Sequence, residues 1–128
     1  MYKAKLNNFR VSARKGRLVA DLIRGKKVEE AQSILRFTLN KSADPMLKLL
    51  NSAAANAEHL DGVKVNDLYI SKVAINEGAT YKRIMPRARG TAYRINKRTS
   101  HFEIELDKMV KKESKVKKED KKVKTEEK

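Results

Sequence analysis

Cysteine and tryptophan are absent from this chain, and aromatic residues make up only 5% of it. Without cysteine there can be no disulfide and no thiolate metal site. So few aromatic residues argue against a surface that binds nucleic acid by stacking bases on a platform of rings. The sequence also has no apolar run of about 18 residues, the minimum for a membrane-spanning helix. Its first residues lack the apolar region of a signal peptide, so we expect a soluble cytoplasmic protein.

Acidic residues are missing from two stretches of the chain. Residues 1–20 contain six Lys or Arg and no Asp or Glu, and residues 78–102 contain seven and none. The whole chain carries 31 basic and 16 acidic residues, a net charge of +15. Residues 1–110 alone carry 22 basic and 11 acidic residues, so the charge is not confined to the C-terminal end. Such a surface predicts a polyanionic partner, which is nucleic acid or an anionic membrane surface.

The composition divides the chain into two parts. Residues 1–110 have the length and apolar content of one globular domain. Residues 111–128 consist almost entirely of Lys and Glu with a few Ser, Val and Thr, and we expect them to form a disordered tail.

Hydrophobic periodicity predicts three helices and three strands. Residues 2–9 alternate loosely and predict a strand, and Ser12 is a candidate N-cap for a helix over residues 13–24. That helix would bury Leu18, Val19, Leu22 and Ile23. A second helix fits residues 28–38, and a third begins after Ser42 or Asp44. Its expected buried face comprises Met46, Leu49, Leu50, Ala53, Ala54 and Ala57.

The other two expected strands flank the acid-free segment. Residues 68–75 are rich in β-branched and aromatic residues, but the phase of their apolar positions slips, which predicts a bulge. From His101 the alternation is regular, with Phe102, Ile104 and Leu106 on one face. The two strands would form an antiparallel hairpin whose long connection, about residues 78–100, projects as a basic arm. An extended ribbon of ten residues would reach roughly 33 Å.

The sequence offers no catalytic constellation. The two histidines, His59 and His101, have no suitable neighbours for metal binding or acid–base work, and no phosphate-binding glycine loop occurs. We therefore expect no enzyme activity, no metal and no cofactor. A DNA-binding or chromatin-like protein would fit the charge, although neither a helix-turn-helix nor a dimer signature supports it.

Four motifs, in order, resemble the family of the bacterial large-subunit ribosomal protein twenty-two. They are VADLIRGKKV (residues 19–28), SAAANAEH (52–59), KRIMPRARG (82–90) and KRTSH (97–101), and the similarity covers about residues 4–107. The chain departs from the family at Thr91, where a basic residue is common, and at Tyr93, where a polar one is. The Lys/Glu-rich extension is a third departure.

The resemblance implies an α+β fold, with three helices packed on a small three-stranded antiparallel sheet and a long extended β-hairpin arm. It implies a structural role in the large ribosomal subunit, in which the protein bridges rRNA domains during assembly. The expected partners are large-subunit rRNA, neighbouring ribosomal proteins and the nascent peptide, with no membrane partner and no homo-oligomer. The expected tip in the peptide exit tunnel comprises Arg87, Ala88, Arg89, Gly90, Thr91 and Ala92. The residues expected to bind rRNA are Arg10, Arg14, Lys15, Arg17, Lys26, Lys27, Lys82, Arg83, Arg87, Arg89, Arg94, Lys97 and Arg98.

Overall fold

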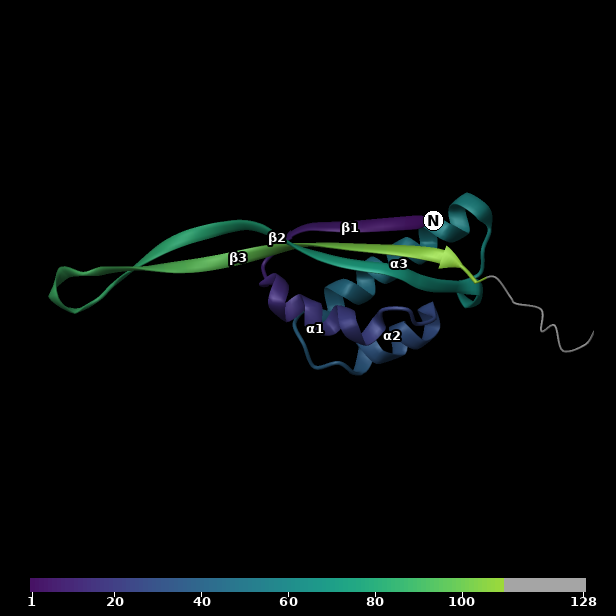
Figure 1. Ribbon diagram of the computed structural model, residues 1–128, viewed down its shortest axis with the longest axis horizontal. Helices are drawn as coiled ribbons and strands as arrows, with labels where there is room; N and C mark the ends of the chain where they lie inside the picture. The colour runs from purple at the N-terminus through teal and green to yellow at the C-terminus, as the bar shows by residue number, and fades with distance from the viewer. Residues whose placement is uncertain (110–128) are drawn as a thin grey trace, which may run out of the picture.

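The computed structural model describes residues 1–109, so the expected tail at 111–128 lies outside the described residues. Figure 1 shows a body of helices and sheet from which a two-stranded ribbon extends far to one side. This arrangement confirms the predicted α+β class and the hairpin arm. In chain order, the elements are β1 (Tyr2–Phe9), α1 (Ala13–Ile23), α2 (Val28–Phe37), α3 (Ala43–Asp61), the 3-10 turn Val65–Asp67, β2 (Leu68–Pro86), the 3-10 turn Ala88–Gly90 and β3 (Ala92–Lys108).

The sheet has the antiparallel strand order β1-β3-β2, so the last strand of the chain is the central one. Its apolar face is covered by the helices, as Figure 1 shows, and Phe102, Ile104 and Leu106 of β3 are buried as the alternation predicts. The pairing of β2 with β3 shifts between Ile70 and Lys72. This irregularity is the bulge that the slip in apolar phase predicted.

The other face of the sheet carries a ladder of ion pairs. The carboxylate of Glu105, whose residue is only 5% exposed, lies 3.0 Å from the Lys3 ammonium and 3.2 Å from that of Lys72. Hydrogen bonds from these two lysines hold the pKa of Glu105 below its usual range. Lys5 pairs with Glu103 at 2.9 Å in the same way. The lysines of β1 therefore neutralise the acids of β3.

Helix α3 matches its prediction closely. All six residues expected on its buried face are buried, and it ends at Gly62 with a left-handed backbone, φ +62°. Ser42 occupies the N-cap position but makes no capping bond with its side chain. The same is true of Ser12 at the start of α1. The predicted cap position was therefore correct for α1, and for α3 the structure selects Ser42 over the alternative Asp44, but neither side chain makes a capping hydrogen bond.

The buried face of α1 agrees with the prediction only in part, because Val19 and Ile23 are buried as expected but Leu18 and Leu22 are not. Leu18 and Leu22 are 64% and 46% exposed, while the helix buries Ala13, Gly16, Val19, Ala20 and Ile23. The reason is a close approach between helix and sheet. A Cβ on Gly16 would lie 3.0 Å from the Phe102 ring, so the aromatic ring takes the space that a leucine would need. Small residues therefore face the sheet, and the two leucines face outward.

Candidate nucleic-acid interface

The arm is a regular two-stranded ribbon. β2 and β3 pair without interruption from Thr80 opposite Arg98 to Pro86 opposite Ala92. Seven residue pairs at about 3.3 Å each give a reach of roughly 23 Å. Figure 1 shows that the ribbon has no helix beside it, so both of its faces are open to a partner.

A compact turn closes the arm at its tip. The backbone N–H of Arg87 donates to the carbonyl of Thr91 at 2.9 Å, and the Thr91 hydroxyl donates to the Ala88 carbonyl at 2.9 Å. Arg89 and Gly90 both adopt left-handed backbones, with φ of 62° and 69°. A glycine tolerates this conformation easily, whereas an arginine rarely adopts it. The turn holds the Arg89 backbone in this conformation at the far end of the arm.

The junction of arm and body is tightly built. The pairing of β2 with β3 shifts a second time between Glu77 and Thr80. A Cβ on Gly78 would lie 2.6 Å from the Thr99 hydroxyl oxygen, so only glycine fits there without movement. Thr99 donates a hydrogen bond to the Ala79 carbonyl at 2.6 Å, and the buried Ser100 hydroxyl donates to the Val11 carbonyl at 2.8 Å. These contacts fix the direction in which the arm leaves the body.

Basic side chains occupy both faces of the arm. Residues directly opposite each other in an antiparallel pair share a face, and successive residues alternate. One face, called here the tyrosine face, holds Tyr81, Arg83, Met85, Tyr93, Ile95 and Lys97. The opposite face holds Thr80, Lys82, Ile84, Arg94, Asn96 and Arg98. Every one of these cations is exposed, so the arm presents positive charge in two opposite directions.

A cleft of about 640 Å³ lies where the arm meets the body. Its walls come from the start of α1, the connection between α2 and α3, and the base of the arm. The Arg10 guanidinium lies 5.9 Å from the centre of the Tyr81 ring on one wall. The lining residues are Arg10, Val11, Ser12, Lys15, Asn40, Lys41, Tyr81, Arg83, Asn96, Lys97 and Arg98.

The N-terminus of α1 adds positive potential beside this cleft. Arg14, Lys15 and Arg17 lie near its start, with no acid in the first turn and no side-chain cap. Cations at this end of a helix oppose the helix dipole, so the arrangement is unfavourable unless an external anion offsets it. Arg17 is partly engaged, since its Nε donates to the Ile75 carbonyl at 3.2 Å. Arg14 lines a smaller hollow with Ser12, Glu77 and Arg98.

Several cations of the body are paired with acids, whereas the cations of the arm are not. Within residues 1–109, acidic partners lie within 4 Å of Lys3, Lys5, Arg24, Lys26, Lys72 and Lys108. None of the seven arm cations has such a partner in this range, and neither do Arg10, Arg14, Lys15 and Arg17. The arm and its base therefore carry a dense group of cations that no acid neutralises within the described residues.

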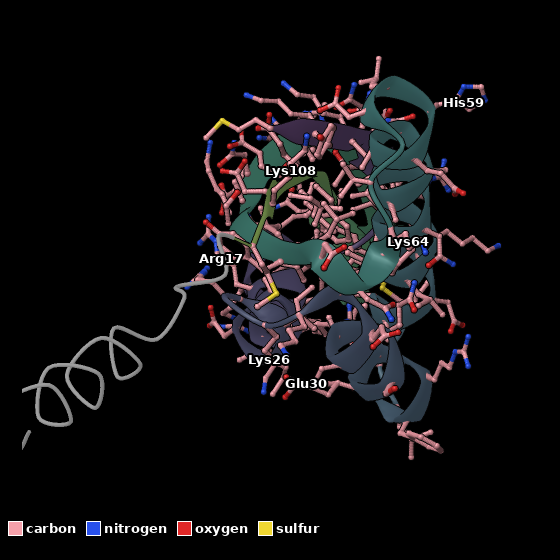
Figure 2. The ribbon with its side chains drawn as sticks, turned by 90° about the vertical axis from the view of Figure 1, so that its right-hand side faces the viewer. Arg17, Lys26, Glu30, His59, Lys64 and Lys108 are labelled. Carbon is pink, nitrogen blue, oxygen red and sulfur yellow. The ribbon has the colours of Figure 1, made fainter. Side chains whose placement is uncertain are left out.

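The predicted binding residues form three groups in space. Most lie on the arm or at its base, and Arg87 and Arg89 lie at the tip. Lys26 and Lys27 are separate from both groups: Figure 2 looks onto the end of the body opposite the arm and shows Lys26 beside Glu30 there. The two charged groups are 2.6 Å apart, so this lysine is already paired.

Five residues of the cleft were not singled out from the sequence, namely Val11, Asn40, Lys41, Tyr81 and Asn96. Tyr81 and Asn96 lie within the expected basic arm but carry no charge, and Asn40 and Lys41 lie outside the acid-free stretches. The polar residues Asn40, Lys41 and Ser42 mark a break between α2 and α3, and this was the signal that could have drawn attention to the segment. Its closeness to the arm is a tertiary feature.

A comparison with known families agrees with this geometry. The model of the family described as ribosomal protein L22p/L17e matches residues 4–107, which include the body and the complete arm. This family consists of structural, non-enzymatic proteins of the large ribosomal subunit, whose partners are rRNA and ribosomal proteins. No helix within the part of the chain that the structure describes is long and apolar enough to cross a membrane. The match spans most of the sequence, and the chain therefore belongs to the ribosomal protein L22p/L17e family.

Proposed function

We propose that this protein binds large-subunit rRNA with its arm and arm base, and that the arm holds separate rRNA segments together during subunit assembly. The resemblance of the arm sequence supports a further placement of the tip. Residues 87–92 would line the peptide exit tunnel near its constriction and face the nascent peptide, while the body would lie near the tunnel exit.

The observation that carries this proposal is the distribution of unpaired charge on the arm. A ribbon that lay on a single RNA surface would need cations on one face only. Here Arg83 and Lys97 lie on the tyrosine face, and Lys82 and Arg94 lie on the other. The arm cations would neutralise RNA phosphates that lie against both faces of the arm at the same time, and the counterions of those phosphates would be released. Two RNA segments that repel each other can then approach from opposite sides of the arm.

The proposed contacts differ in strength. Arm and arm-base cations have no acidic competitor, so each can replace a counterion at a phosphate. Lys27 is exposed at the far end of the body and provides a second, smaller contact, whereas the bond from Lys26 to Glu30 weakens the contribution of Lys26. The proposed rRNA contacts are Arg10, Arg14, Lys15, Arg17, Lys26, Lys27, Lys82, Arg83, Arg87, Arg89, Arg94, Lys97 and Arg98.

Sedimentation of a cell lysate at rising salt tests this function. An arm enclosed between RNA segments cannot leave by surface counterion exchange alone. We therefore expect the protein to migrate with large subunits at low salt and to stay with them through a moderate-salt wash. Migration with free proteins or with the nucleoid at low salt would contradict the proposal.

A further inference from the structure

The cleft at the arm base is larger than a phosphate group needs. Its volume of about 640 Å³ falls within the range of about 300–1,000 Å³ that is typical of small-molecule sites. A volume of this size can hold a single nucleotide, whereas a base-paired helix is much larger. The size of the cleft therefore points to one unit of an RNA chain.

The positive charges that line the cleft favour the binding of an anionic group. Six cations surround it, no Asp or Glu lines it, and none of the six has an acidic partner within residues 1–109. They come from three separate parts of the chain, so the fold gathers them at this place. The six are Arg10, Lys15, Lys41, Arg83, Lys97 and Arg98.

Two further groups in the cleft suit a nucleobase. Tyr81 is 41% exposed, and the Arg10 guanidinium lies 5.9 Å from the centre of its ring. Aromatic rings and guanidinium planes are the surfaces on which unpaired bases stack. The side-chain carbonyl oxygen of Asn40 accepts a hydrogen bond from the Ser42 backbone at 2.9 Å, which fixes the amide. Its NH₂ group makes no hydrogen bond within the described residues and remains available to a base edge.

From this combination we infer that the cleft captures one unpaired RNA nucleotide, with its base on Tyr81 and Arg10 and its phosphates among the surrounding cations. The inference rests on the proposed function, because it assumes an RNA partner, and it names the element of that RNA. An unpaired nucleotide held here would fasten the RNA to the junction from which the arm departs. The arm would then enter the RNA in a defined direction.

The test uses the full chain and two RNA hairpins that differ by one nucleotide. One hairpin is fully paired, and the other carries a single bulged 2-aminopurine. Replacing an aromatic residue on which a base stacks by alanine typically weakens the affinity for the nucleic acid by about 5- to 150-fold. We expect the bulged hairpin to bind tighter by a factor in this range, with quenching of the 2-aminopurine fluorescence as the base stacks.

Variants of two arm tyrosines make the test specific. Tyr81→Ala should abolish the preference for the bulge, and Tyr81→Phe should retain it because the ring remains. Tyr93→Ala is the matched control, since Tyr93 lies near the tip and does not line the cleft, and it should leave the preference unchanged. Equal binding of both hairpins, or a preference that survives Tyr81→Ala, would overturn the inference.

Failure of this inference can be told apart from failure of the proposed function. Binding of a large-subunit rRNA transcript without any bulge preference would reject nucleotide capture and leave the rRNA role intact. Binding of the transcript but of neither hairpin would also reject the cleft as an independent site. Absence of binding to the transcript itself would reject both.

Discussion

Replacing two arm cations should make RNA binding less sensitive to salt, whereas replacing two body cations should not. The arm variant is Lys82→Gln/Arg94→Gln. Both residues are exposed on the same face of the ribbon and lie outside any ion pair within residues 1–109. The control is Lys5→Gln/Arg24→Gln. It removes the same two residue types from pairs with Glu103 at 2.9 Å and with Asp21 at 3.0 Å.

The expected magnitude follows from counterion release. Each phosphate contact contributes about 0.7–0.9 to the slope of log affinity against log salt. If all seven arm cations engage phosphates, the unaltered protein should have a slope of about −5 to −6. The arm variant should be shallower by about 1.4–1.8, and the control should change little because its cations are already neutralised.

The assay is fluorescence anisotropy with a large-subunit rRNA transcript over about 50–200 mM salt. At the upper end the Debye length is under about 10 Å, so long-range effects of net charge are largely screened. Thermal unfolding of both variants checks that folding is intact. Equal changes in slope for the two variants would refute the distinction between paired and unpaired cations, and an unchanged slope in the arm variant would refute phosphate contact by the arm.

Three further predictions concern the junction, the tip and the sheet. Gly78→Ala should lower the free energy of unfolding by about 1–3 kcal/mol through overpacking against Thr99, and an unchanged denaturant midpoint would show that the junction has room. Arg89→Ala should leave the melting temperature unchanged because the tip lies away from the body; a loss of stability that parallels the loss of RNA affinity would contradict this. The pKa of Glu105 is lowered in the folded state by Lys3 and Lys72. Its stabilising effect should therefore be present above its ordinary value of about 4.3 and be lost as pH falls below it. Urea unfolding from neutral to acidic pH should show this loss, and Glu105→Gln should reduce it.

The sequence predicted the elements whose signals are local. β1 begins and ends where the alternation predicted, and the buried face of α3 was correct at every position named, including Met46 and Ala57. Even the bulge after Ile70 was visible as a slip in apolar phase. These features depend on the order of residues within one segment, which the sequence displays directly.

The orientation of α1 could not be predicted in the same way. Two of its four predicted core residues, Leu18 and Leu22, face outward, because the helix places Gly16 next to the Phe102 ring instead. That ring is distant in sequence and reaches the helix only when the sheet has formed. Leucine is more hydrophobic than glycine and would normally be expected on the buried face. Here the close approach of the helix to the sheet leaves room only for a glycine beside the ring.

In the candidate site, too, the local features could be predicted from the sequence, whereas the features that depend on tertiary contacts could not. The arm cations follow directly from an acid-free run, and their lack of ion-pair partners within residues 1–109 agrees with that pattern. The cleft depends instead on the approach of Lys41, from a helix connection, to Tyr81 on the arm. The pairing of Lys26 with Glu30 also needed coordinates, since a spacing of four residues permits an ion pair without requiring one.

Photo-crosslinking from the two faces of the arm tests the central claim most directly. A benzoylphenylalanine at Ile84 would face one way and one at Met85 the other, because they are successive residues of β2. With the altered protein incorporated into large subunits, the account predicts crosslinks from both positions to rRNA, in segments far apart in the RNA sequence. Crosslinks from both positions to one segment, or from one face only, would contradict an arm held between RNA segments.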